Sequence, residues 1–141
     1  LNPDQMALVR PTQLYLSMIA YDERLYKQIN RPQVRDGWKR LNEGIEAFNA
    51  NPSKKAVRIT LVRGYNLEHP ERFAKLVEKA NPDYIEPKGY VHVGYSRRRL
   101  ERSDMPTLDE VLEFSKRLSE VTGYEVADYS ESSKVALLKR R

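Results

Sequence analysis

The chain contains no cysteine, so it can form no disulfide and offers no thiolate to a metal ion or an iron–sulfur cluster. Histidine is nearly as scarce: the chain has two, His69 and His92. Their spacing is not that of metal ligands. No apolar run approaches the about 20 residues of a membrane span, and no signal peptide is visible. A glycine-rich phosphate loop and a Ser-His-Asp set are also lacking. The sequence therefore predicts a soluble, cytoplasmic protein with no membrane partner and no metal site of its own.

The length of 141 residues is enough for one domain with a hydrophobic core, and we expect a single domain over residues 1–141. Lysine plus arginine number 25 against 20 acidic residues, which gives a formal charge of +5. This mild excess permits a nucleic-acid partner without requiring one. The sequence begins with Leu1 and not methionine, so we expect that it is a piece of something longer.

Apolar runs with strand character alternate with amphipathic segments along the chain. We expect strands at residues 12–20 (apolar on both faces, as if buried on both sides), 56–62, 84–85, 90–93, 124–128 and 135–138. Between them we expect a short helix that Asp22 caps and that ends before Pro32, and helices at about 36–51, 70–80 and 107–122. Asp36 is the expected cap of the second helix, Thr107 and Glu110 have the spacing of a capping box at the start of the last helix, and Gly123 is placed to end it. Strands alternating with helices predict an α/β fold with a parallel sheet and right-handed crossovers.

In this fold class the chemistry gathers at the carboxyl ends of the strands. The expected strand ends carry Ser17, Arg63 with Asn66, and Lys88 with Tyr90. The Ser17 hydroxyl suits a ligand's ribose or carboxylate, but it equally suits a bond to the backbone. Asn66 follows Gly64, so a turn residue is its alternative role.

Each of three further polar residues has a possible functional role and a possible structural role. Arg58 alternates with apolar neighbours on a strand, which favours either a bound anion or an internal glutamate as its partner. His69 precedes Pro70 and is interpreted as a helix cap, not a catalytic base. His92 has no carboxylate neighbour in the sequence and is interpreted as structural.

The stretch from residue 83 to residue 102 combines tyrosines with cations. Between Lys88 and Arg102 it holds five cations against one anion, Glu101. Arginine pairs with phosphate and tyrosine stacks on bases, so the pattern is typical of an RNA contact. A solvated edge loop is the alternative. The cations and tyrosines concerned are Lys88, Tyr90, Tyr95, Arg97, Arg98 and Arg99.

Several blocks, in order, resemble a known family. They are residues 11–17 (PTQLYLS), 29–32 (INRP), 36–38 (DGW), 58–66 (RITLVRGYN) and 86–96 (EPKGYVHVGYS), followed by 104–106 (DMP), 123–125 (GYE) and 133–138 (SKVALL). Together they resemble the C-terminal half of the 4-demethylwyosine synthases, radical SAM enzymes of wyosine biosynthesis on tRNA. The likeness covers nearly the whole chain, and it implies the later part of a radical SAM (β/α) partial barrel.

The resemblance implies an enzyme, a radical SAM lyase, that condenses pyruvate carbons with N1-methylguanosine-37 of phenylalanine tRNA. It implies S-adenosyl-L-methionine and a [4Fe–4S] cluster as cofactors, and the tRNA anticodon stem-loop and pyruvate as partners. The family's cluster-binding cysteines lie upstream of the matched region, and this chain has none. We therefore expect the cluster-bearing half to be supplied by the same or a separate chain, and this chain alone to be inactive.

The resemblance also suggests roles for particular residues, while the catalytic residues stay unknown. Ser17 matches a strand serine that touches S-adenosylmethionine, and Arg63 and Asn66 match the loop that flanks it. The residues that match the region facing the anticodon stem-loop are Lys88, Tyr90, Tyr95, Arg97, Arg98 and Arg99, and Arg31 is a further phosphate candidate.

Two alternatives from other classes stay open. One is a non-catalytic RNA-binding α/β module, and the other is an α/β domain whose basic edge binds a protein. A piece of a barrel predicts an unpaired edge strand near residues 12–20. An independent RNA-binding module predicts that this edge is covered, and a protein-interaction domain predicts no affinity for RNA.

Overall fold

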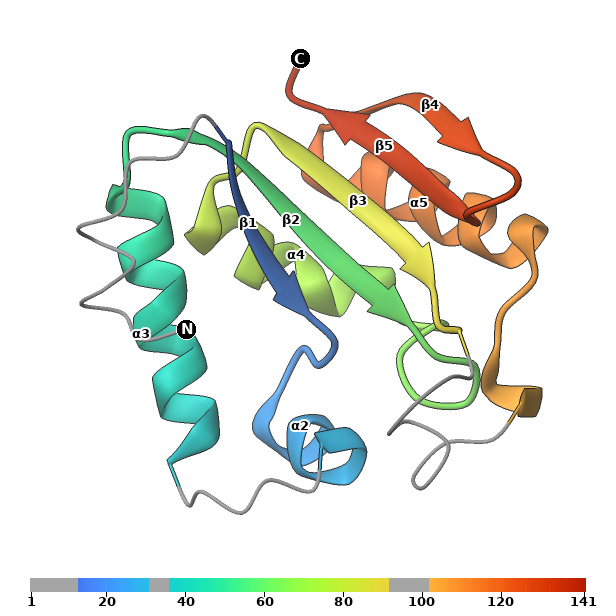
Figure 1. The fold of residues 1–141 in the computed structure, drawn as a ribbon, viewed down its shortest axis with the longest axis horizontal. Helices are drawn as coiled ribbons and strands as arrows, with labels where there is room; N and C mark the ends of the chain where they lie inside the picture. The colour runs from blue at the N-terminus through green and yellow to red at the C-terminus, as the bar shows by residue number, and fades with distance from the viewer. Residues whose placement is uncertain (1–12, 31–35, 92–101) are drawn as a thin grey trace.

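The first three strands are joined by helices, as the sequence pattern predicted. The computed structural model describes residues 13–30, 36–91 and 102–141. Its sheet has five strands in the order β1-β2-β3-β5-β4, with helices packed against one face (Figure 1). The strands are β1 (Gln13–Met18), β2 (Lys54–Leu61), β3 (Tyr84–Gly89), β4 (Glu125–Ser130) and β5 (Val135–Lys139). The α/β class predicted from the sequence is confirmed.

Strand direction changes partway across the sheet. β1, β2 and β3 run parallel, with Ser17 opposite Arg58 and Arg58 opposite Glu86. β5 runs antiparallel to both β3 and β4. The four residues between β4 and β5 are too few for a crossover connection, which needs about a dozen or more residues, so these two strands form a hairpin. The parallel sheet predicted from the sequence is therefore correct for β1, β2 and β3 and wrong for β5, which runs antiparallel to both of its neighbours.

Helix starts follow two of the capping signals closely. At α2 (Glu23–Asn30), the Asp22 carboxylate accepts a hydrogen bond of 2.8 Å from the Leu25 N–H. At α5 (Leu108–Thr122), Thr107 and Glu110 form the expected capping box. Gly123 ends α5 with a φ of 79°, a left-handed conformation that favours glycine.

The other two helices start without a side-chain cap. Asp36 precedes α3 (Gly37–Ala50), but its carboxylate contacts the Arg40 side chain at 3.3 Å and caps no N–H. His69 occupies the cap position of α4 (Pro70–Ala80), and its Nδ1 lies 3.3 Å from a Glu71 carboxylate oxygen. Both residues are thus at the predicted helix boundary, but neither side chain makes the predicted bond.

One hydrophobic core lies between the sheet and the helices. It contains the residues of β1, β2 and β3 that alternate toward the helices, together with Ile45 and Phe48 of α3, Phe73 of α4 and Phe114 of α5. Phe73 and Phe114 meet edge to face with ring centroids 5.9 Å apart. The core therefore fixes α4 and α5 against the same side of the sheet.

The opposite face of the sheet has no helix over it among the described residues. Tyr15 of β1 is 47% exposed on this face, so the expectation of a strand buried on both sides is wrong for β1. β1 is also the edge strand, and no described residue pairs with its outer side. The unpaired edge expected for a piece of a barrel is thus present.

The β-prone stretch near residue 90 is organised differently from the prediction. β3 continues through Lys88 and Gly89, and Tyr90 and Val91 lie beyond its end. The Tyr90 N–H donates to the Leu61 carbonyl at 2.8 Å, which joins the ends of β3 and β2. The rest of the predicted strand at residues 90–93 lies outside the described residues.

Candidate functional site at the ends of the parallel strands

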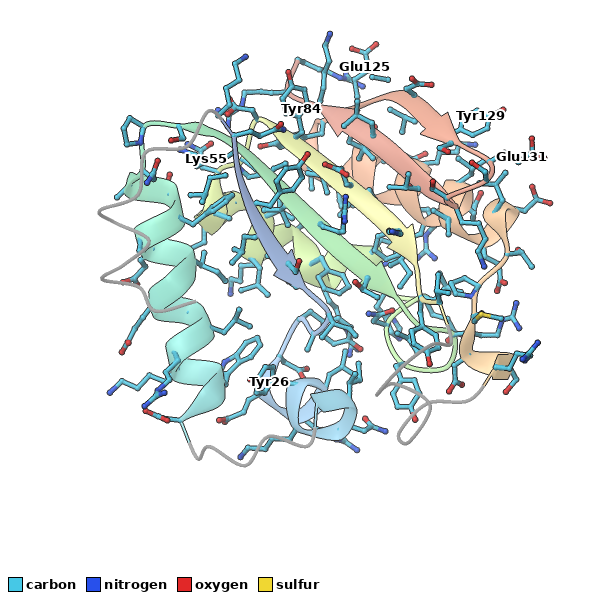
Figure 2. The ribbon with its side chains drawn as sticks, viewed as in Figure 1. Tyr26, Lys55, Tyr84, Glu125, Tyr129 and Glu131 are labelled. Atoms are coloured by element: carbon cyan, nitrogen blue, oxygen red, sulfur yellow. The ribbon has the colours of Figure 1, made fainter. Side chains whose placement is uncertain are left out.

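The face of the sheet opposite the helices is called here the inner face. On β1, β2 and β3 it carries Gln13, Tyr15, Ser17, Lys54, Ala56, Arg58, Thr60, Tyr84, Glu86 and Lys88. In Figure 2 this face is toward the viewer, with Tyr84 at the start of β3. Because the three strands are parallel, their carboxyl ends lie at one edge of the sheet, where ligands bind in α/β folds.

Arg58 stands at the centre of the inner face and is paired within the chain. Its Nη2 donates to Glu86 Oε1 at 2.9 Å, and its guanidinium lies 5.7 Å from the centre of the Tyr15 ring. Its Nε is buried without a hydrogen-bond partner among the described residues. Of the two partners that the sequence suggested, the internal glutamate is the one present.

Ser17 lies beside Arg58 in the register of the sheet, on the exposed side of β1. Ser17 lines a hollow of about 270 Å³ at the ends of β1 and β2, together with Tyr26, Thr60 and the apolar residues Met18, Ile19 and Leu41. Three hydroxyl-bearing side chains around one hollow suit a ligand with hydroxyl or carboxylate groups. The position of Ser17 is therefore compatible with the cofactor contact predicted for it.

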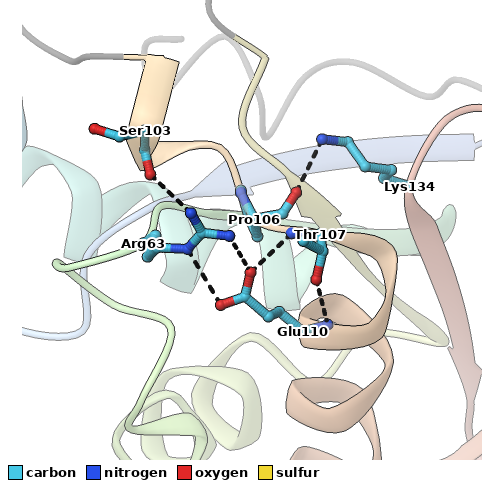
Figure 3. A network of polar contacts seen from close by, with 6 residues as sticks. All are labelled: Arg63, Ser103, Pro106, Thr107, Glu110 and Lys134. Atoms are coloured by element: carbon cyan, nitrogen blue, oxygen red, sulfur yellow. Dashed lines mark hydrogen bonds and ion pairs between the residues drawn. The ribbon is translucent and has the colours of Figure 1, made fainter.

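Arg63, just beyond β2, is held by the start of α5 (Figure 3). Its Nη2 and Nε both donate to the Glu110 carboxylate, and its Nη1 donates to the Ser103 carbonyl at 3.1 Å. Glu110 Oε1 also accepts from the Thr107 N–H at 2.9 Å. One carboxylate thus caps α5 and fixes an arginine 47 residues away.

The Arg63–Glu110 contact changes the ionisation of both groups. Hydrogen bonding from Arg63 is the main cause that lowers the pKa of Glu110 from 4.5 to about 2, with the Thr107 N–H adding to it. The hydrogen bond to Glu110 raises the pKa of Arg63. Both groups are therefore charged at neutral pH.

Asn66 is completely buried, and its side chain joins the ends of two strands. Its Oδ1 accepts from the Val62 N–H at 2.7 Å, and its Nδ2 donates to the Ile19 carbonyl at 2.7 Å and the Thr60 carbonyl at 2.8 Å. Both amide hydrogens are used within the chain. This geometry favours a structural role over the direct cofactor contact suggested by the resemblance.

The residues predicted to face RNA divide into three groups. Lys88 lies on the inner face of β3, opposite Thr60. The Tyr90 side chain is 6% exposed and packs with Val62, which favours a packing role over base stacking. Arg31, Tyr95, Arg97, Arg98 and Arg99 lie outside the described residues, as does His92.

The sequence reasoning missed the site roles of two carboxylates. Glu86 is the partner of Arg58, and its place opposite Arg58 depends on strand register, which the sequence did not specify. Glu110 was identified as a capping residue, but nothing in the local pattern pointed to Arg63. Among the described residues no group of histidine, aspartate and glutamate side chains could hold a metal ion, and no helix could span a membrane.

Replacing Glu110 with glutamine tests the ion pair without removing the helix cap, because glutamine also completes a capping box. We expect E110Q to lower the free energy of unfolding by about 1 kcal/mol near neutral pH, a modest effect because the pair is partly exposed. Since the pKa of Glu110 is lower in the folded chain, this contribution is full above pH 4.5 and disappears as the pH falls toward about 2. Urea denaturation from pH 7 to pH 2 measures it.

The control is E113Q, an exposed glutamate on the same helix, for which we expect a change within about 0.5 kcal/mol. A difference between E110Q and the unsubstituted chain that stays constant down to pH 2 would contradict the assigned pKa.

Replacing Asn66 with alanine tests the bridge between the strand ends. N66A leaves the Val62 N–H and two carbonyls without partners in a buried place, so we expect a loss of about 3 kcal/mol in the free energy of unfolding. Asn49, exposed on α3, supplies the control N49A with an expected change within about 0.5 kcal/mol. Equal denaturation midpoints for the two variants would show that the bridge is dispensable.

The chain is similar to known proteins over nearly its full length. The family model for wyosine base formation matches residues 79–140. A tRNA 4-demethylwyosine synthase of Pyrococcus abyssi is 42% identical over 92% of this chain and 38% of the relative, and one from Methanocaldococcus jannaschii is 38% identical over 96% of this chain and 43% of the relative. The chain thus spans less than half the length of these curated relatives.

Solved structures agree with the sequence comparison. A structure of TYW1 with a lysine–pyruvate adduct bound superposes with a TM-score of 0.85 at 35% identity, over 98% of this chain and 44% of that one. The radical SAM enzyme coproporphyrinogen III oxidase of Escherichia coli, with a TM-score of 0.64 at 16% identity over 99% of this chain and 33% of that one, shows the fold alone.

The predicted resemblance is confirmed by these matches, by the open edge at β1 and by the radical SAM-related fold. Over nearly its whole length, the chain corresponds to the C-terminal part of the 4-demethylwyosine synthases.

Proposed function

We propose that this chain is the later part of a radical SAM tRNA 4-demethylwyosine synthase and lines one side of its active site. The observation that carries the proposal is the combination of an unpaired β1 edge and a polar inner face without a helix over it. A chain that matches 44% of the TYW1 structure at a TM-score of 0.85 supplies part of the same sheet and leaves the rest to residues outside this sequence. The reaction proposed is condensation of pyruvate carbons with N1-methylguanosine-37 of phenylalanine tRNA.

The cofactors are divided between the two parts of the enzyme. A [4Fe–4S] cluster does not fit this chain, which has no cysteine, so we assign it to the upstream half. We place part of S-adenosylmethionine, which supplies the radical when bound, beside Ser17 and Thr60, because its ribose and carboxylate match hydroxyl partners. By itself the chain is inactive in this proposal.

The residues after β2 shape the cofactor end of the site. Glu110 balances the charge of Arg63, and together with the Ser103 carbonyl it holds the guanidinium in place, so Arg63 presents its remaining N–H groups in a fixed position beside the strand ends. Asn66 acts indirectly, by holding the Ile19 carbonyl at the end of β1 near β2. We therefore propose Ser17 and Arg63 as cofactor contacts and Asn66 as a positioning residue.

The basic stretch is anchored at the same edge of the sheet. The basic stretch comprises residues 88–102, of which residues 92–101 lie outside the described part of the chain. They are flanked by Val91, just beyond the end of β3, and by Arg102. There the Arg63 N–H donates to the Asp104 carbonyl at 2.8 Å, which ties the returning segment to the end of β2. Both anchors lie where a substrate approaches the strand ends, which supports phosphate contacts by Arg97, Arg98 and Arg99, with Lys88, Tyr95 and Arg31 as further candidates.

The RNA contact is tested with the triple variant R97A/R98A/R99A in the complete enzyme. Because each neutralised phosphate contributes about 0.7 to 0.9 to the salt slope, we expect the slope for an anticodon stem-loop to fall by about 2 to 3, with weaker binding at every salt concentration. Titration of labelled stem-loop RNA at several salt concentrations measures both quantities.

The matched control is K39A/K75A/K116A, which removes the same charge from exposed positions on the three helices behind the sheet. We expect it to change the slope by less than about 1. If the two triple variants behave alike, the basic stretch is not the RNA contact and general charge explains the binding.

A further inference from the structure

The inner face carries more positive than negative charge at its carboxyl-end half. Arg58 and Lys88 stand there against one carboxylate, Glu86, among the described residues of β1, β2 and β3. Among the described strand residues, the next carboxylate of this face is Asp128 of β4, three strands from Arg58, or about 14 Å at the usual strand spacing. One positive charge is thus left without a close anion.

The two cations are close enough to share one ligand. Arg58 faces Glu86 across the strand pair, and Lys88 follows Glu86 by two residues on the same face. Strand spacing and rise place their Cα atoms about 8 Å apart, well within the combined reach of the two side chains. The Ser17 and Thr60 hydroxyls occupy the neighbouring positions on β1 and β2.

Neither cation is fully used by the chain itself. Arg58 donates one hydrogen bond to a described residue, from a guanidinium that has five N–H groups. Its side chain is 39% exposed, and its buried Nε has no partner among the described residues. Lys88 forms no hydrogen bond or ion pair with any described residue. Donors therefore remain for a ligand on this face.

Covering the inner face would make its excess positive charge energetically unfavourable. If the rest of the barrel covers the inner face, these charges are withdrawn from water, and an uncompensated buried charge is strongly unfavourable. An anion supplied by a ligand removes this cost and binds tightly for the same reason.

We propose that Arg58 and Lys88, with the hydroxyls of Ser17 and Thr60, form a binding site for the carboxylate of a small ligand. Arginine matches a carboxylate with two parallel hydrogen bonds, lysine adds a point charge, and a hydroxyl donates a third bond. Pyruvate and the amino-acid part of S-adenosylmethionine both carry such a group. The choice of these two molecules as ligands rests on the proposed function, whereas the carboxylate site itself is argued from the charges and positions of the four residues.

The test measures the dissociation constants of [14C]pyruvate and of S-adenosylmethionine for the complete enzyme by equilibrium dialysis, without tRNA. We expect K88M and R58M each to raise the constant for one of the two ligands at least tenfold. We expect E86Q to lower it, because the released Arg58 guanidinium gains a free face for the ligand. A variant that only damages the fold would not tighten binding.

The matched control is K54M, which removes the same charge from the same face but six residues before Thr60 on β2. We expect less than a twofold change for it. The ligand whose affinity responds to K88M and R58M identifies the source of the carboxylate. Unchanged affinities for both ligands, or equal effects of K54M and K88M, would overturn the site whether or not tRNA binds.

Discussion

Coverage of the sheet by helices on one side is the constraint on which the other features depend. Side chains alternate along a strand, so the residues that fill the core fix which residues stand on the other face. Val57, Ile59 and Leu61 of β2 are completely buried under the helices, and this forces Arg58 and Thr60 to the inner face. The polar inner face is thus a direct consequence of the packing of the apolar face against the helices.

The ends of the parallel strands are held together by contacts between distant parts of the chain. The Asn66 side chain joins β1 to β2, the Tyr90 N–H joins β3 to β2, and Arg63 joins β2 to the start of α5. All three contacts lie at the edge of the sheet where we place the ligands. They give a fixed frame from which the basic stretch begins and to which it returns.

Much of this fold could be predicted from the sequence because its signals are local. Asp22, the Thr107–Glu110 pair and Gly123 mark helix ends through bonds or conformations within a few residues, and each acts as expected. Asp36 and His69 show the limit of such signals, because they mark a boundary without capping it. The family was recognisable because several motif blocks occur in order along the whole chain.

The remaining features depend on contacts that no local pattern encodes. The pairing of Arg58 with Glu86 spans 28 residues and requires the register of β2 and β3. The antiparallel pairing of β5 with β3 sets Tyr84 opposite Lys139, which is distant in the sequence. The exposure of Tyr15 follows from its place on the inner face, over which no described helix packs. Asn66 was chosen for its place in a loop, whereas its burial and three bonds were visible only in the fold.

The central claim is that the open edge of β1 and the inner face belong to the inside of a larger barrel. Hydrogen–deuterium exchange of the β1 amides, compared between this chain alone and the complete enzyme, tests it most directly. We expect the amides of residues 13–18 that point away from β2 to exchange at least tenfold more slowly in the complete enzyme, because a neighbouring strand then pairs with them. Equal exchange rates in the two samples would contradict the account.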